Sequence, residues 1–152
     1  MRRFKQTKDV LDYVRKFHGQ LSEYYDSMSQ IAEKERVKML LDYLSRHEKH
    51  IEASVAEFEK DASKNILNTW FQFMPKNFPP DCFEKNGLKP NMSVDEVITV
   101  ALHFDDCLVE LYKVMAKEAE ISEVKDLFTT LLKMEQQEER TLARDSLWLK
   151  DM

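Results

Sequence analysis

Acidic and histidine side chains stand on the predicted inner faces of four helical segments in this chain. At about 100° per residue they project within the apolar arc of each segment, near its middle. These side chains are His18, His47, Glu48, Asp105, Glu135 and Glu138, with His50 at the edge of the arc. Because mid-helix positions of an antiparallel bundle share one layer, we expect these groups to converge.

The chemistry of these side chains is that of a metal site. Buried carboxylates are costly unless they are paired, hydrogen-bonded or bound to a cation. Two divalent ions would balance the carboxylates of this layer if all of them are ionised. Carboxylate and imidazole donors together suit iron, manganese or zinc. Four-helix bundles with such donors in the core usually hold iron or manganese pairs. The sequence therefore favours a metal site in the core, with a dinuclear iron or manganese centre as the form that balances the charge.

Four segments with helical periodicity must position these residues. They span residues 7–33, 35–62, 93–119 and 122 to nearly the C-terminus, with apolar residues at alternating spacings of four and three. Thr7 is the expected N-cap of the first helix, and Ser93 and Glu96 have the spacing of a capping box. The chain has only two Gly and four Pro, the residues that interrupt helices most strongly. We therefore predict one all-α domain over residues 1–152, a four-helix bundle.

The connections predict the topology. Short links at 33–36 and 120–121 require antiparallel neighbours, whereas residues 63–92 hold all four prolines and can run the length of the bundle. Two hairpins joined by one long crossover is the ferritin-like arrangement. The crossover is unusually apolar, and we expect either a lid packed on the bundle or a surface for a homodimer or ligand. Its apolar residues are Ile66, Leu67, Trp70, Phe71, Met74, Phe78 and Phe83.

Composition excludes several classes of partner. The net charge is −5 and the basic residues form no stripe, which argues against a nucleic-acid partner. No segment approaches the ~20 apolar residues of a membrane span, and the N-terminus does not resemble a secretory signal. Cys82 and Cys107 match neither a disulfide framework nor a Cys-rich zinc site. We therefore expect reduced cysteines and a cytoplasmic protein.

Two segments resemble the repeated helical hairpins of rubrerythrin-type ferritin-like proteins: LLDYLSRHEKHIEASVAEF and VKDLFTTLLKMEQQEERTL. In that family the first and third helices each supply a Glu, and the second and fourth each supply Glu-x-x-His. The resemblance covers the four helices and not the crossover. It implies a ferritin-like fold and, if the site is active, oxygen or peroxide chemistry at a dinuclear metal centre.

The family motifs are altered in this chain. His47 and His50 stand where the first Glu-x-x-His would be, and Glu135 and Glu138 stand in the second. Only His50 and Glu135 keep the family's residue type. His18 falls at or near the Glu of the first helix. Asp105 is chosen from the apolar periodicity of the third helix alone.

Three hypotheses follow. The first is a ferritin-like protein with a non-standard metal site, acting as an oxidase, a peroxidase or a metal-handling protein. The second is a metal-free structural or interaction module, in which the same side chains form a buried salt-bridged layer. The altered motifs favour this module, and the number of inward carboxylates favours the metal. The third, a magnesium-dependent nuclease or other hydrolase, has only the acidic residues in its favour.

Overall fold

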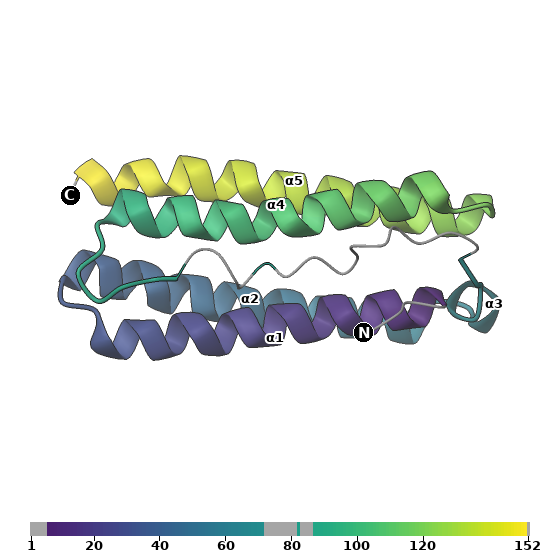
Figure 1. Cartoon of the computed structure of the whole chain (residues 1–152), viewed down its shortest axis with the longest axis horizontal. Helices are drawn as coiled ribbons and strands as arrows, with labels where there is room; N and C mark the ends of the chain where they lie inside the picture. The colour runs from purple at the N-terminus through teal and green to yellow at the C-terminus, as the bar shows by residue number, and fades with distance from the viewer. Residues whose placement is uncertain (1–5, 72–81, 83–86, 152) are drawn as a thin grey trace.

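Four long helices form two antiparallel hairpins in the computed structural model, which describes residues 6–71, 82 and 87–151, with backbone only at 146 and 149–151. The helices are α1 (Thr7–Ile31), α2 (Glu35–Asp61), the single turn α3 (Lys64–Leu67), α4 (Val94–Glu118) and α5 (Ser122–Asp151). Figure 1 shows the α1/α2 hairpin lying along the α4/α5 hairpin, with all four long helices nearly parallel to one axis. The all-α bundle is therefore confirmed.

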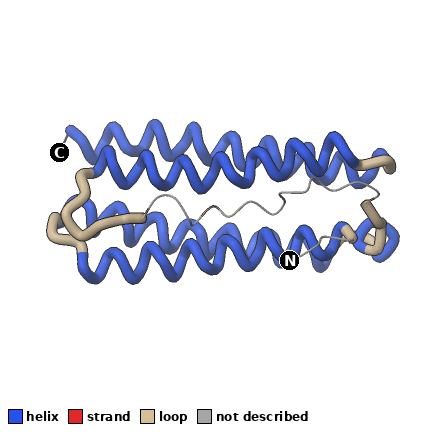
Figure 2. The backbone as a smooth tube through the Cα atoms, in the orientation of Figure 1, coloured by secondary structure: helices blue, strands red, loops and turns tan. Residues whose placement is uncertain are grey.

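The chain crosses the length of the bundle between the two hairpins. α3 lies at the end of the bundle where α2 ends, and α4 begins at the opposite end (Figures 1 and 2). A simple up-and-down bundle would begin its third helix at the same end. The predicted crossover is therefore confirmed from its two described ends, while residues 72–81 and 83–86 lie outside the described part of the chain.

The predicted helix ends agree with the structure to within two residues, and the caps explain them. Ser93 Oγ accepts a hydrogen bond from the Glu96 amide at 3.2 Å, and Glu96 Oε1 accepts one from the Ser93 amide at 3.3 Å. This is the expected capping box. The expectation for Thr7 is wrong, because Gln6 is the residue that precedes the first helical turn. The Thr7 amide instead donates to the Thr69 carbonyl at 3.0 Å and ties α1 to the start of the crossover.

The aromatic residues of the crossover are not all buried. Trp70 is 64% exposed, so the expectation that it packs as part of a lid is wrong. The predicted helical face does not form, because α3 ends at Leu67 after one turn. Phe71 is half-buried, with its ring centroid 5.9 Å from that of Phe128 on α5. The predictions for Met74, Phe78 and Phe83 fall outside the described residues.

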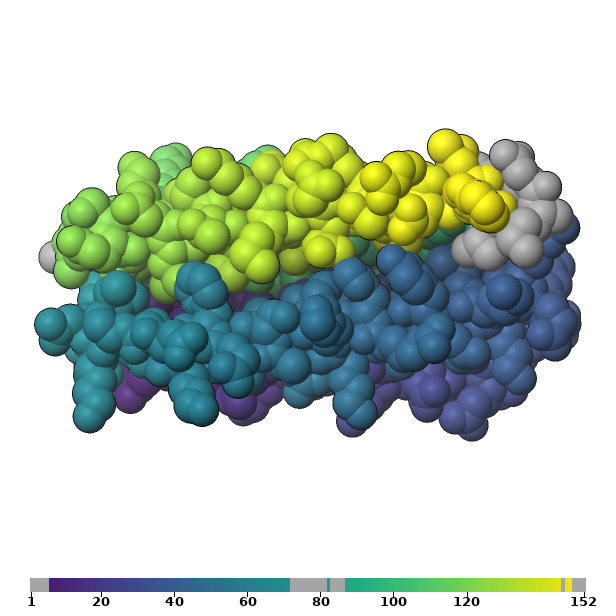
Figure 3. Space-filling view, turned by 180° about the vertical axis from the view of Figure 1, so that it is seen from behind, coloured from purple at the N-terminus to yellow at the C-terminus, as the bar shows by residue number. Residues whose placement is uncertain are grey.

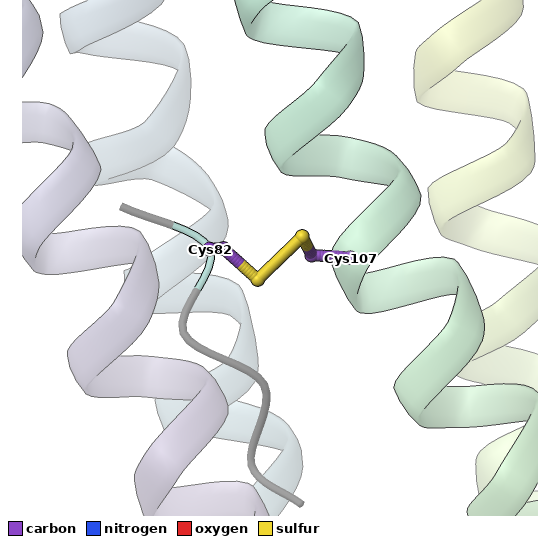
Figure 4. The surroundings of a disulfide bond; sticks show 2 residues. All are labelled: Cys82 and Cys107. Carbon is purple, nitrogen blue, oxygen red and sulfur yellow. A yellow bond between two sulfur atoms is a disulfide. The ribbon is translucent and has the colours of Figure 1, made fainter. Parts of the chain in front are cut away.

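A disulfide joins the crossover to the bundle. Cys82 and Cys107 are bonded, with 6.3 Å between their Cα atoms (Figure 4). The expectation of reduced, unpaired cysteines is therefore wrong. Cys82 lies beside the middle of α4 in the folded chain. The two cysteines are 25 positions apart, and this separation alone does not predict that they meet. A second tie is the hydrogen bond from the Leu88 amide to the Tyr24 hydroxyl at 2.6 Å.

Throughout the described part of the chain, no helix combines the length and the apolar character that spanning a bilayer requires.

Candidate functional site

His18 and Glu48 form the most deeply buried polar pair of the bundle. His18 on α1 is 0% exposed and Glu48 on α2 is 4% exposed. The distance between His18 Nδ1 and Glu48 Oε2 is 2.5 Å. Burial alone would lower the pKa of His18, but the hydrogen bond and the charge of Glu48, together with the charge of Glu135, raise it above its usual value. The contact with Glu48 therefore favours the protonated form of His18 despite its burial.

Asp105 on α4 and Glu135 on α5 form an acid pair across the second hairpin. Both are buried, and burial is the main reason that their pKa values rise, for Glu135 to about 7. Their mutual hydrogen bond raises the pKa of Asp105 and lowers that of Glu135, which favours the proton on Asp105. Two carboxyl groups that share one proton keep a single negative charge in the core.

His47 and Glu138 form a third pair, closer to the surface. Their Nε2 and Oε2 atoms lie 2.5 Å apart, between α2 and α5. This hydrogen bond is the main cause of the lowered pKa of Glu138 and of the raised pKa of His47. The His47 ring also stacks on Tyr43, with 5.8 Å between ring centroids. The hydrogen bond therefore favours the ionised forms of both groups, and an aromatic neighbour packs against the pair.

Six of the seven predicted site residues thus meet in one polar layer in the middle of the bundle. The exception is His50, whose side chain is exposed at the edge of the layer and lowers the pKa of Glu138 only through its charge. Together the layer holds two His–Glu pairs and one pair of acids. The role of these residues as metal ligands stays a prediction.

Two tyrosines lie beside the layer. Tyr25 and Tyr112 are fully buried, and burial together with the nearby carboxylates raises the pKa of each well above its usual value. Each lies seven positions after a layer residue on its own helix, Tyr25 after His18 and Tyr112 after Asp105. That spacing places both residues on one helical face and could have identified them.

Two cavities adjoin the layer, on opposite sides of Glu138 along the bundle axis. The smaller, of about 10 Å³, is lined by His47, Glu48, Asp105 and Glu138 together with aromatic and aliphatic side chains. The larger, of about 180 Å³, is mostly apolar and meets the layer at His18 and Glu135. The small cavity is about the size that holds one water molecule.

Two buried atoms of the layer have no hydrogen-bond partner within the described residues: His18 Nε2 and Glu135 Oε1. Leaving such an atom without a partner costs about 1–3 kcal/mol. Glu48 holds Nδ1 of the His18 ring, so Nε2 is turned to the opposite side. His18 and Glu135 both line the larger cavity and neither lines the smaller one.

The donors are arranged in pairs and not around a common point. Among residues 6–71, 82 and 87–151, no group of three or more His, Cys, Asp or Glu side chains is placed to hold a metal ion. The chemistry of the donor set still suits a cation, because three carboxylates and one imidazole surround the small cavity. Binding of an ion there would require the His47–Glu138 pair to open.

Comparison of the sequence with protein-family models and with curated proteins finds no match. Two solved structures resemble the fold. One is a Thermotoga maritima protein, provisionally named a ferritin-like diiron-carboxylate protein, with a TM-score of 0.59, 12% identity, and coverage of 96% of this chain and 97% of the other. The second is a hypothetical protein from Pyrococcus furiosus, with a TM-score of 0.52, 18% identity, and coverage of 95% and 90%. With its two antiparallel hairpins and long crossover, the chain has the ferritin-like fold.

Proposed function

We propose that this chain is a ferritin-like metal-binding protein that holds a divalent ion in the polar layer of its bundle. The observation that carries the proposal is the small cavity of about 10 Å³, lined by His47, Glu48, Asp105 and Glu138. Three oxygen donors and one nitrogen donor suit iron, manganese or zinc. Burial, and after it the charges of neighbouring carboxylates, raise the pKa values of Asp105 and Glu135, and a bound cation would offset the second of these effects.

The chain's own residues would have distinct roles in such a site. Glu48, Asp105 and Glu138 would hold the ion through carboxylate oxygens, and His47 through Nε2. His18 would orient Glu48 through its Nδ1–H hydrogen bond, as residues behind metal ligands commonly do. Iron or manganese, when bound, would supply redox chemistry toward oxygen or peroxide, the rubrerythrin-like activity. A dinuclear centre would need a second ion near His18, His50 and Glu135.

Metal content and thermal stability together test this proposal. Protein purified without chelator should contain iron, manganese or zinc by element analysis. Chelator should lower its Tm, because an ion present at about 100 times its Kd stabilises the folded state by about 2.7 kcal/mol. Protein that contains none of these metals and melts identically with and without chelator would contradict the proposal.

A second candidate function is a metal-free structural or interaction module. The observation that favours it is that both histidines of the layer already have carboxylate partners: His18 is bonded to Glu48, and His47 is bonded to Glu138. Such pairs specify which helix faces meet without any ligand. A homodimer through the crossover or a bundle face belongs with this candidate. The chelator-insensitive result described above is the outcome that this module predicts.

A cytoplasmic location stays part of the proposal, but the cysteines no longer argue for it. Disulfides persist mainly in oxidising compartments. In the cytoplasm, the Cys82–Cys107 bond would have to form reversibly. Counting free thiols in protein isolated under conditions that block thiol exchange would decide which state the cell maintains.

A further inference from the structure

The larger cavity is a separate feature of the bundle. It has a volume of about 180 Å³ and lies between α2 and α5, which are side by side on the face shown in Figure 3. An apolar cavity of about 150 Å³ in another protein accommodates benzene. This space is therefore large enough for a molecule with one six-membered ring.

Aliphatic and aromatic side chains form the inner walls of this cavity. Val55 and Phe58 line it from α2, Tyr112 from α4 and Leu131 from α5. Val55, Tyr112 and Leu131 are at most 5% exposed, so the walls that they form lie in the core of the bundle. Water between such walls has few hydrogen-bond partners, and its displacement by an apolar molecule is favourable.

The cavity opens to the surface between the two helices. His50 and Ser54 on α2 and Met134 on α5 line it and are exposed, and Met134 offers a large apolar side chain that is 50% exposed. Glu138 is only partly buried, and its Oε2 is bonded to His47. The polar residues on this side of the cavity therefore remain in contact with water or with each other.

The buried polar residues of the lining do not offer a ligand a partner. His18 is bonded through Nδ1 to Glu48, and Glu135 shares a hydrogen bond with Asp105. His18 Nε2 and Glu135 Oε1 have almost no accessible surface, so even a water-sized molecule in the cavity does not touch them. A charged ligand would therefore lose its hydration without reaching a free counter-charge inside the cavity.

We infer that this cavity binds a small, neutral, apolar molecule of about one six-membered ring, for which fluorobenzene is the probe. The ring would lie against Val55 and Phe58 on one side and Leu131 on the other, and it would enter past Ser54 and Met134. This site is separate from the proposed ion, which the small cavity would hold. It therefore goes beyond the proposed function and does not depend on it.

Fluorine NMR of the full chain with fluorobenzene and with para-fluorobenzoate tests the inference. Both molecules have one fluorinated ring, and only the second is charged. Fluorobenzene should bind once per chain with a Kd on the order of 0.1–1 mM, and para-fluorobenzoate about tenfold or more weakly. A clearly smaller difference between the two ligands, or no binding of fluorobenzene in this range, would overturn the inference.

Variants of α2 locate the binding. Val55→Phe fills the cavity with a ring of its own and should abolish fluorobenzene binding, whereas Glu57→Phe adds the same ring at an exposed position that does not line the cavity and should leave binding unchanged. If Val55→Phe does not fold, Ser54→Phe at the opening and Ala53→Phe beside it form a second matched pair. Equal effects within the pair that folds would overturn the assignment.

The outcome is separable from that of the proposed metal site. The titration is run on chelator-treated protein and repeated after manganese is added. Fluorobenzene binding should persist in both samples, whether or not element analysis finds an ion. Loss of fluorobenzene binding on addition of manganese would overturn the inference of a separate site, whereas an absence of metal from the purified protein would contradict only the proposed function.

Discussion

His18 and Glu48 lie 30 positions apart in the sequence, yet a 2.5 Å contact between Nδ1 and Oε2 joins them in the core between α1 and α2. The contact balances the histidine charge and fixes the orientation of the ring. It also turns Nε2 away from Glu48. One hydrogen bond thus connects the stability of the first hairpin with the chemistry of the site.

Removal of Glu48 should destabilise the fold strongly. Glu48→Leu leaves the buried His18 ring without its partner, and we expect the free energy of unfolding to fall by about 3–5 kcal/mol. The double variant His18→Leu/Glu48→Leu should lose clearly less than the sum of the single variants. Urea unfolding measures all three, with the exposed Glu57→Leu on the same helix as the control. Additive losses would show that the two residues are not energetically coupled.

The stability of the metal-free protein should decrease as the pH rises from about 5 to about 8. The pKa of Glu135 rises from 4.5 to about 7 on folding, and those of Asp105 and His18 also rise, so the folded state binds more protons in this range. Their contribution is complete below the unfolded pKa values and is lost as the pH passes the folded ones. For Glu135 alone we expect about 1–3 kcal/mol, at about 1.4 kcal/mol per pKa unit. Glu138, whose pKa is lowered, acts in the opposite sense only in more acidic solution.

Glu135→Gln is the control for this pH dependence. The amide has nearly the shape of the protonated acid and does not titrate, so the slope of stability against pH should become smaller. Urea unfolding of the chelator-treated proteins at several pH values measures the slope. A wild-type stability that is constant or rises across the range would contradict the prediction.

Asp105→Asn should weaken metal binding, whereas Asp106→Asn should not. Asp105 is buried and lines the small cavity, while its neighbour Asp106 is exposed. Asparagine keeps the shape and removes the charge that a divalent ion requires. We expect the affinity for manganese to fall about tenfold or more in the first variant. Element analysis after dialysis against manganese compares them, and equal metal content would place the ion elsewhere.

Reduction of the Cys82–Cys107 disulfide should destabilise the protein. The bond closes a loop with a sequence separation of 25, for which the chain-entropy model predicts about 3 kcal/mol. Urea unfolding with and without a reductant measures the difference, and Cys82→Ser should show the same loss with no response to reductant. Identical unfolding of wild type in both conditions would show that the bond does not constrain the chain.

Tryptophan fluorescence reports on association through the crossover. Trp70 and Trp148 are 64% and 76% exposed, and they are the two tryptophans of the chain. Both should emit like solvent-exposed indole in dilute protein and should be quenched readily by acrylamide. If a homodimer forms through the crossover, the emission of a Trp148→Phe variant should shift to the blue as its concentration rises. A constant spectrum over the concentrations where scattering shows dimers would place the interface elsewhere.

The sequence by itself determined the four long helices, their order and the crossover. Helical periodicity and capping act over a few residues, so Ser93 and Glu96 predicted the start of α4 correctly. Connection lengths then restrict the topology. A link of two residues can join only the adjacent ends of two helices, so the two helices must be antiparallel. The polar layer was also visible, since Glu48 and Asp105 stand at positions of the apolar periodicity near the middle of their helices.

Only the tertiary structure decided which groups meet. The pairing of His18 with Glu48 depends on the axial offset and rotation of α1 against α2, which periodicity does not specify. The disulfide depends on where the crossover passes α4, and the exposure of Trp70 depends on the end of α3 after one turn. The cavity beside His18 and Glu135 exists because side chains from four helices leave space between them. Such features depend on how far each helix is shifted and rotated relative to its neighbours, and no local pattern of residues specifies these shifts.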